Sequence, residues 1–285
     1  DVLFGNPPKT DINIKTSKID IPQDSLEKIE IEKACENILR FPTVADKTFL
    51  IHIGDRTVGG LIAQDQFVGP WQIPVSNVGV TIRDHFSNKG EAMSMGERSP
   101  VASLNPCASG RLAVAEALTN ALSADIEKIS DIKLSANWMS SIQTDSQKQA
   151  LFETVEAITL NLCSRIGLTI PVGKDSLSMQ TSWSEGEISK KVVSPLSLVI
   201  TAFAPVMDVR KTITPQLQPK KDTSIILIDL GDGQNRLGAS CLSQIYNIPM
   251  GTPPDLDDHN LLVNFFSAIT LLKKQNKILA YHDRS

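Results

Sequence analysis

Residues 111–120, RLAVAEALTN, place a carboxylate and an amide close together in an otherwise apolar stretch. Glu116 and Asn120 are four positions apart, so on a helix both side chains lie on the same face. Two interpretations are open from the pattern alone. The pair faces solvent, or it is buried, and then the carboxylate needs a cation or hydrogen-bonding partners. Such oxygen atoms suit a hard cation such as Mg²⁺, which commonly binds together with nucleotide phosphates.

Three other segments carry polar groups that could bind a ligand. GDGQNRLG (231–238) follows a predicted strand and precedes a predicted helix, but it matches no phosphate-binding pattern, so a plain turn is favoured. PVGKDSLSM (171–179) resembles the end of a P-loop, but the first glycine of that motif is missing, so the segment is not a Walker A motif. HDRS (282–285) follows an apolar run, and ends of strands often hold ligand-binding groups in α/β folds. The spacing of these residues identifies no catalytic nucleophile.

The composition is that of an ordinary globular protein. The chain has 285 residues, of which 41% are hydrophobic and 21% charged, with a net charge of -4. The length favours about two domains, and the lack of a basic surplus argues against nucleic-acid binding. There is no apolar run of about 20 residues and no signal-peptide pattern, so we expect no membrane association and a cytoplasmic location. The four cysteines form no CxxC pair, which predicts buried free thiols in a reducing compartment.

The elements that must position these groups are a mixture of strands and helices, which predicts an α/β or α+β fold. Asn105 and Pro106 predict the start of the helix that carries Glu116. The predicted helices are 25–41, 106–122, 146–166, a helix that starts within 239–247, and 261–277. The predicted strands are 48–54, one within 55–63, 78–84, 131–139, one within 168–183, 194–206 (buried on both faces), 223–231 and 278–283.

The organisation along the chain predicts three parts. Residues 1–22 are rich in Pro, Lys, Thr and Asp and are typical of a linker, and PQLQPKKD (215–222) marks a boundary. The chain begins with DVLFGNPPKT and ends at AYHDRS without a capping element. We therefore expect a fragment of a longer polypeptide, whose second domain is truncated.

Seven sequence blocks, in this order, resemble one enzyme family. They are GDRTVGGLIAQDQFVGPWQIPVSNVGVT (54–81), GEAMSMGERSPVA (90–102), RLAVAEALTN (111–120), IKLSANWM (132–139), PVGKDSLSM (171–179), SPLSLVI (194–200) and AYHDRS (280–285). The chain is similar to the large, single-chain phosphoribosylformylglycinamidine synthases, also called formylglycinamide ribonucleotide amidotransferases, over essentially its whole length.

The resemblance implies a fold, a reaction and a domain division. Members of the family convert formylglycinamide ribonucleotide, ATP and glutamine into formylglycinamidine ribonucleotide in purine biosynthesis. Their core is a pair of units similar to aminoimidazole ribonucleotide synthetase, and a glutaminase domain supplies ammonia. This chain resembles the second unit. Residues 1–43 would be the end of the preceding unit with a linker and helix, 44–214 the N-terminal synthetase-like domain, and 215–285 the start of the C-terminal α/β domain.

The resemblance also implies site residues. Glu116, Asn120 and Asp283 match magnesium ligands of a nucleotide site, and Asn77 stands at a ligand position that we associate with aspartate. Its amide oxygen can coordinate a cation, but it carries no charge. The positions expected to contact the nucleotide are Lys47, Ser76 and Ser285.

The duplication of the core implies that chemistry takes place in the first unit, while the second holds ATP or ADP with Mg²⁺ as a structural element. The family is an ATP-dependent C–N ligase, and we expect the isolated fragment to be inactive. Its implied partners are the first synthetase unit and the glutaminase domain of the same polypeptide. Two alternatives stay open: a structural module of the pseudo-symmetric core that binds no nucleotide, and a complete relative such as a hydrogenase-maturation or selenophosphate-type ATPase.

Overall fold

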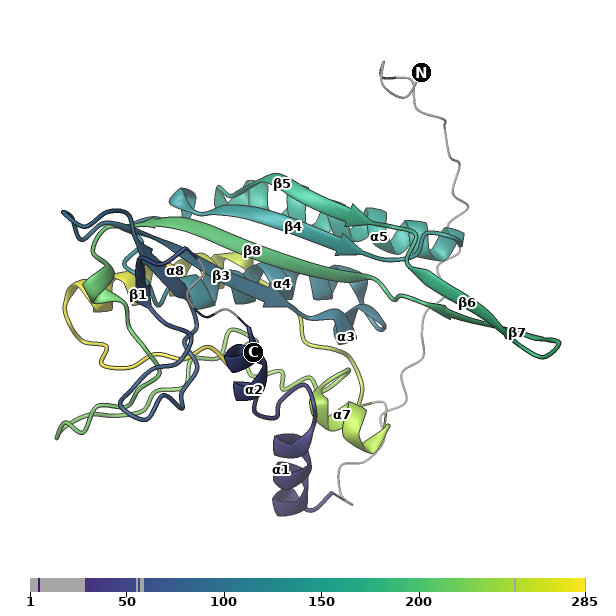
Figure 1. Cartoon of the computed structure of the whole chain (residues 1–285), viewed down its shortest axis with the longest axis horizontal. Helices are drawn as coiled ribbons and strands as arrows, with labels where there is room; N and C mark the ends of the chain where they lie inside the picture. Colours follow the sequence, from purple (N-terminus) through teal and green to yellow (C-terminus); the bar gives the residue numbers. More distant parts are fainter. Residues whose placement is uncertain (1–4, 6–28, 55, 57–58, 249, 285) are drawn as a thin grey trace.

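A six-stranded sheet forms the centre of the molecule (Figure 1). The computed structural model describes residues 5, 29–54, 56, 59–248 and 250–284; apart from Gly5, the predicted linker lies outside them. The strand order is β1-β2-β3-β8-β4-β5, and only the β4–β5 pair is parallel. The strands are β1 (Ile62–Gln64), β2 (Gly79–Ile82), β3 (Gly90–Glu97), β8 (Ser197–Val206), β4 (Lys133–Met139) and β5 (Thr169–Ser176). The predicted α/β class is confirmed.

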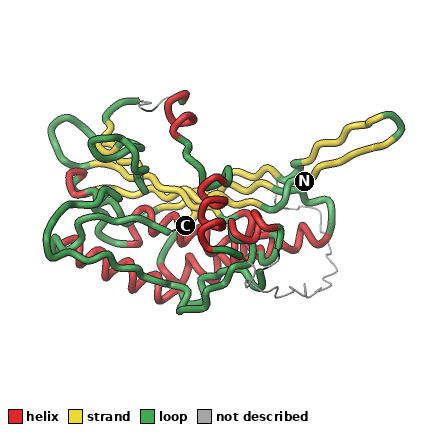
Figure 2. The backbone as a smooth tube through the Cα atoms, turned by 90° about the horizontal axis from the view of Figure 1, so that it is seen from below, coloured by secondary structure: helices red, strands yellow, loops and turns green. Residues whose placement is uncertain are grey.

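Long helices cover one face of this sheet (Figure 2). They are α4 (Pro106–Ala121), α5 (Asp145–Ile158) and α8 (His259–Lys274). Their apolar side chains and those of the sheet belong to one continuous hydrophobic core. After α5 the chain passes through a π-helical turn, Thr159–Cys163, into α6 (Ser164–Ile166), so the predicted helix 146–166 is confirmed with a local irregularity.

The other face of the sheet is not covered in the same way. In β8 the residues of one face, such as Ile200 and Ala202, are buried, whereas Phe203 on the opposite face is 43% exposed. The prediction that this strand is buried on both faces is therefore wrong. Its continuous apolar run does not distinguish a central strand with two covered faces from one with a single covered face.

The sequence pattern did not reveal β3, although this strand lies between β2 and β8. Its buried positions are Gly90, Ala92, Ser94 and Gly96, and its exposed positions include Met93, which is 52% exposed. Small residues on the core side hide the alternation by which a half-buried strand is recognised. They have a structural purpose, because they let α4 approach the strand backbone closely.

Three predicted strands are wrong in the described residues. The segment 48–54 forms helix α2 (Thr48–Ile53), and neither 223–231 nor 278–283 is a strand. In the first hydrophobic run after the boundary, Ile225 is 87% exposed. A strand needs a neighbour to which it can hydrogen-bond, and these apolar runs pair with none of the described strands. A short helix such as α2 needs no neighbouring strand, because some of its backbone N–H and C=O groups hydrogen-bond to each other.

The remaining elements surround this core. The hairpin of β6 (Gln180–Glu185) and β7 (Ile188–Val193) projects from the body in Figure 1. The other α-helices of the described residues are α1 (Ile31–Arg40), α3 (Ser99–Ala102) and α7 (Cys241–Tyr246). All four cysteines are free, but only Cys163 is buried, so the prediction of buried thiols holds for that residue alone. Among the described residues, no helix is long and apolar enough to cross a membrane.

Candidate functional site

Helix α4 carries the candidate site, and local sequence determines where it begins. The Asn105 side chain accepts a hydrogen bond from the backbone N–H of Ala108 at 3.0 Å, and Pro106 occupies the first helical position. Most of the helix surface is buried, whereas Glu116 and Asn120 are half-buried. The two interpretations left open by the sequence are thus resolved in favour of a partly buried polar pair that has hydrogen-bonding partners.

The first partner is strand β3, which the helix contacts almost backbone to backbone. A Cβ atom added at Gly96 would lie 2.0 Å from the carbonyl oxygen of Ala113. The Ser94 hydroxyl donates to the carbonyl of Ala117 at 2.7 Å. Because the strand lies so close, the backbone N–H of Glu97 reaches the Glu116 carboxylate at 2.7 Å. The half-buried carboxylate is therefore held by a backbone donor, which partly compensates its desolvation.

The amide of Asn120 connects β3 with two distant segments. Its nitrogen donates to the carbonyl of Met95 at 3.1 Å, and its oxygen accepts from the Asn77 amide nitrogen at 2.8 Å. The Asn77 oxygen lies 2.8 Å from Nδ1 of His282. The structure thus brings together the predicted residues Asn77, Asn120 and the polar segment near the end of the chain.

Asp283 reaches the same helix through Thr119. The Thr119 hydroxyl donates to the Asp283 carboxylate, and the Tyr281 hydroxyl donates to the Thr119 carbonyl at 2.8 Å. Burial, followed by the nearby Asp283 charge, raises the pKa of Tyr281, so this hydroxyl keeps its proton. Thr119 and Tyr281 were not predicted as site residues. The only sequence signal for Thr119 is its place between Glu116 and Asn120 on the same helix.

Of the predicted nucleotide contacts, Ser76 and Lys47 hydrogen-bond within their own segments. The Ser76 hydroxyl, next to Asn77, donates within its own loop to the carbonyl of Val78 at 2.8 Å. Lys47 lies just before α2, and its ammonium group donates to the Ala45 carbonyl. Ser285 lies outside the described residues. None of the contacts described for Lys47 links it to Glu116 or Asn120.

The donor set fits a hard cation by its chemistry. Glu116 and Asp283 supply carboxylate oxygens, and Asn120 and Asn77 supply amide oxygens, which are the ligand types that Mg²⁺ prefers. In the part of the chain that the structure describes, no three His, Cys, Asp or Glu side chains are grouped so as to hold a metal ion. A cation here would therefore depend on the amide oxygens as well as the two carboxylates.

Backbone N–H groups of the glycine-rich turn at 231–238 donate hydrogen bonds to a carboxylate of the same chain. The Asp229 carboxylate accepts hydrogen bonds from the N–H groups of Gly231 and Gly233, both at 2.9 Å. These bonds, more than the charge of Arg284, lower the pKa of Asp229. Because two of the turn's donors are already occupied by a carboxylate, the turn is not arranged to bind a phosphate, in line with the plain turn favoured by its sequence.

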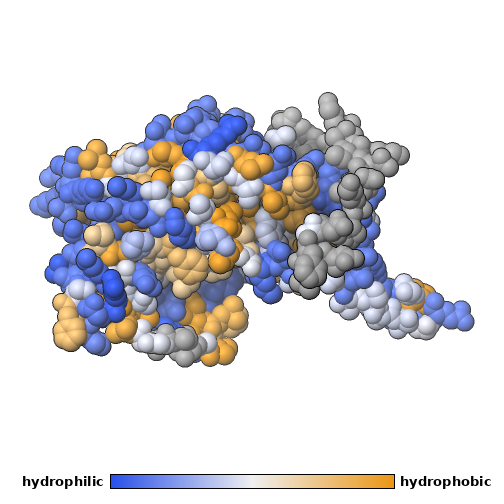
Figure 3. All heavy atoms as spheres, turned by 90° about the horizontal axis from the view of Figure 1, so that it is seen from above, coloured by the Kyte–Doolittle hydropathy of each residue, from blue (hydrophilic) through white to orange (hydrophobic). Residues whose placement is uncertain are grey.

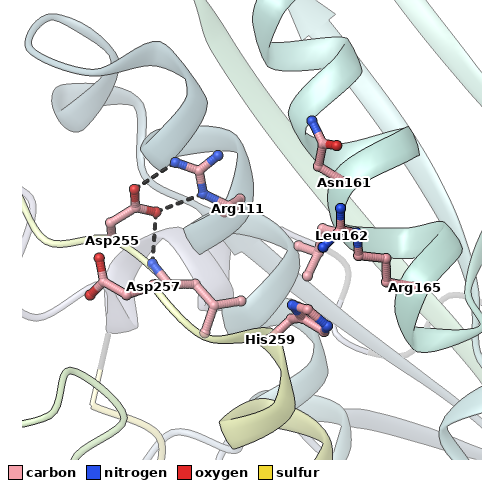
Figure 4. Close-up of a pocket in the computed structure, with 8 residues that line it drawn as sticks. Arg111, Asn161, Leu162, Arg165, Asp255, Asp257 and His259 are labelled. Atoms are coloured by element: carbon pink, nitrogen blue, oxygen red, sulfur yellow. Dashed lines mark hydrogen bonds and ion pairs between the residues drawn. The ribbon is translucent and has the colours of Figure 1, made fainter.

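A pocket of about 300 Å³ lies elsewhere on α4, between that helix, residues 161–165 and the segment before α8. Arg111 forms an ion pair with Asp255 on its wall, with Nε 2.8 Å from one carboxylate oxygen (Figure 4). Arg165 and His259 lie across from this pair in Figure 4. None of the predicted site residues that the structure describes lines this pocket, so it is separate from the Glu116 cluster.

Comparison with known proteins gives one family and several solved structures. Residues 46–205 match the model of a family described as FGAR-AT PurM_N-like domain. Thermotoga maritima PurL complexed with AMPPCP is 18% identical, with a TM-score of 0.46 over 75% of this chain and 31% of that chain. PurLQS from the same organism is 19% identical, with a TM-score of 0.45 over 75% of this chain and 30% of that one. A HypE–HypF complex is 13% identical, with a TM-score of 0.38 over 71% and 59% of the two chains. This chain therefore spans less than a third of the two Thermotoga chains.

Proposed function

We propose a function from the premise that this chain belongs to the family of FGAR-AT PurM_N-like domains. It is the second synthetase-like unit of a phosphoribosylformylglycinamidine synthase, an ATP-dependent, cytoplasmic C–N ligase of purine biosynthesis. Residues 44–214 are its N-terminal domain, and 215–285 begin the C-terminal domain. The unit binds ADP or ATP with Mg²⁺ and does not itself carry out the amidation.

One observation carries the proposal: the segment that contains Asp283 lies against the turn of α4 that contains Glu116 and Asn120. The hydrogen bond between Thr119 and Asp283 joins residues that are 164 positions apart. Two carboxylates and an amide from distant parts of the sequence thus lie on or against the same part of α4. Carboxylate and amide oxygens are the ligand types that Mg²⁺ prefers, and their meeting at one turn of α4 supports a binding function.

In this proposal Glu116, Asn120 and Asp283 hold the cation, and Asn77 offers a fourth, neutral oxygen. Bound Mg²⁺ would offset the negative charge of the nucleotide phosphates. Lys47 would add a cationic group toward the phosphates, and Ser76 and Ser285 would add hydroxyl contacts. The chain's own part is to position these groups and to keep them partly shielded from water.

Calorimetric titration of the protein with Mg-ADP and Mg-ATP tests the proposal. We expect saturable binding that is abolished by EDTA, and we expect Glu116→Ala to weaken it more than Asn120→Ala, because the first change removes a charge as well as a ligand. Glu156→Ala, at an exposed position of α5, is the matched control and should bind as the wild type does. Absence of heat and of a thermal shift at millimolar nucleotide would reject nucleotide binding.

A second candidate is a structural module of the core that binds no nucleotide. It is favoured by the hydrogen bonds that already satisfy Asn120, Asp283 and Glu116 within the chain. The same titration separates the two candidates, since this one predicts no binding by a protein that is folded and stable.

The open face of the sheet is the surface we propose for the partner synthetase unit. Met93, Met95 and Phe203 are 52%, 56% and 43% exposed on β3 and β8, and a row of apolar side chains on a sheet favours contact with another protein surface. Figure 3, seen from above, shows further apolar groups among hydrophilic ones on the side where Figure 1 draws β5 and α5. Sedimentation of this chain with a separately produced first unit should show a complex, and Met95→Glu should weaken it.

A further inference from the structure

Four segments of the chain meet in a single line of hydrogen bonds. The line runs from His282, through the amides of Asn77 and Asn120, to the carbonyl of Met95 in β3. It joins the loop before β2, helix α4, strand β3 and the segment after α8. Its members are half-buried or exposed side chains rather than core residues, so the line is a connection between elements and not a part of the hydrophobic core.

The direction of every bond in this line is fixed by its last acceptor. A backbone carbonyl can only accept, so the Asn120 nitrogen must point at Met95. The Asn120 oxygen then faces Asn77, which must present its nitrogen at 2.8 Å. The Asn77 oxygen in turn faces His282, whose Nδ1, 2.8 Å away, must carry the proton.

Asn77 must therefore accept one hydrogen bond and donate another. A carboxylate of the same size can accept from His282 but cannot donate to Asn120. Only the amide satisfies both neighbours at once. Two oxygen atoms would otherwise face each other across 2.8 Å, an arrangement that becomes favourable only with a cation between them.

We propose that Asn77 is a positioning residue whose amide joins His282 to Asn120 when no cation is bound. We call this connection of the two segments the closure of the site. The bond holds the 281–283 segment against α4 in the cation-free protein and keeps Asp283 beside Thr119. A cation that binds the Asn120 oxygen competes with the Asn77 nitrogen for that oxygen. The closure itself is independent of the proposed nucleotide function, whereas its competition with a cation rests on that function.

Thermal unfolding of Asn77→Asp, in EDTA and in millimolar MgCl₂ without nucleotide, tests the proposal. In EDTA we expect the variant to melt about 2–4 °C below the wild type, because one hydrogen bond is replaced by two facing acceptors. Magnesium should raise the melting temperature of the variant by more than that of the wild type. Asn88→Asp, an exposed position in the loop between β2 and β3, makes the same charge change and should show neither effect.

Two results would overturn the proposal: a variant as stable as the wild type in EDTA, or an equal effect of magnesium on both proteins. If Asn77→Asp does not fold in EDTA, recovery of the fold in magnesium supports the proposal. If it folds in neither buffer, a double-mutant cycle in EDTA between Asn77→Ala and Asn120→Ala decides. If Asn77 and Asn120 are in direct contact, the folding equilibrium constant of the double variant should differ by about threefold or more from the value expected if the two single effects were independent. Independent effects would reject the proposal.

Failure of the proposed function gives a different pattern. A wild type that binds no Mg-nucleotide, together with an Asn77→Asp variant destabilised in EDTA, would reject nucleotide binding and retain the closure. Nucleotide binding by the wild type, with no effect of Asn77→Asp on the melting temperature in EDTA, would support nucleotide binding and reject the closure.

Discussion

Thr119 is the residue through which α4 holds Asp283. Its hydroxyl has one hydrogen, and its nearest acceptors are the Asp283 carboxylate and the Glu116 carbonyl, the latter at 3.0 Å. A hydrogen bond to a charged group is worth more than a neutral one. At the residue scale, the position of the predicted ligand Asp283 therefore depends on a neighbour that has no charge.

Thr119→Val keeps the shape of the side chain and removes the hydroxyl. We expect a loss of about 1–3 kcal/mol in the free energy of unfolding, since the Asp283 carboxylate loses its donor. Mg-nucleotide binding should also weaken, which calorimetry would measure. Thr119→Ser retains the hydroxyl and is the matched control. Similar stability and affinity in all three proteins would show that this bond does not position Asp283.

Sequence reasoning identified the polar residues of α4 but not what they contact. Asn105, Pro106 and the apolar spacing determine the helix locally, so its limits could be predicted. The donor to Glu116 is the backbone N–H of Glu97 in β3. Every residue except proline has this group, so the residue type at position 97 does not indicate the contact. The contact of Thr119 with Asp283 spans 164 positions and depends on tertiary structure alone. The site residues taken from family resemblance remain predictions.

At the scale of elements, the contact between α4 and β3 depends on small residues. Gly96 lies where an added Cβ would be 2.0 Å from the Ala113 oxygen and 2.6 Å from the Ala117 nitrogen. Both are backbone atoms of a buried helix, which cannot rotate away as a side chain would. The absence of a side chain at this position is therefore what sets the distance between helix and strand, and with it the hydrogen bond from Glu97 to Glu116.

Gly96→Ala should separate the helix from the strand at this point. We expect a loss of about 1–3 kcal/mol in unfolding free energy, as for other overpacked cores, measured by denaturant titration. Gly79→Ala in β2 is the control, because a Cβ there would meet only the Met93 oxygen at 3.8 Å. That variant should be as stable as the wild type or slightly more stable. Equal stability of both variants would contradict the close approach of α4.

Lys273 joins the end of α8 to the end of α4. Its ammonium group donates to the carbonyl of Leu122 at 2.6 Å and to that of Ala124. These are carbonyls at and after the C-terminus of α4, where a cation is favourable. Burial nevertheless lowers the pKa of Lys273 from 10.5 to about 8, with a smaller opposing contribution from the charge of Asp125.

The lowered pKa predicts how stability depends on pH. Between pH 8 and 10.5 the unfolded chain keeps the Lys273 proton and the folded chain releases it, so the unfolded state binds more protons and stability rises with pH. Between pH 8 and 10.5 the unfolding free energy of the wild type should therefore increase relative to that of Lys273→Met. Using the difference cancels other groups such as Tyr281. Lys274→Met, at the exposed neighbour, controls for the lost charge, and a flat difference for Lys273→Met would refute the assignment.

At the scale of the whole molecule, the predicted boundary at 215–222 does not separate two cores. Helix α8 follows this boundary, yet Leu262, Phe266 and Ile269 belong to the same hydrophobic core as α4. The sequence showed that α8 has an apolar side but not which surface covers it. Only the three-dimensional arrangement shows that this side is covered by the helices and strands that precede the boundary.

Limited proteolysis tests this arrangement. Lys220 and Lys221 are exposed in a segment without regular structure, so trypsin should cut there early. We expect the C-terminal fragment to stay with the rest of the molecule during gel filtration, because burial of each large apolar side chain of α8 contributes about 1.5–3 kcal/mol. Phe266→Ala removes about 3–5 kcal/mol of this packing and should let the fragment dissociate after the same cut. Dissociation of the wild-type fragment under native conditions would show that the two parts are independent domains.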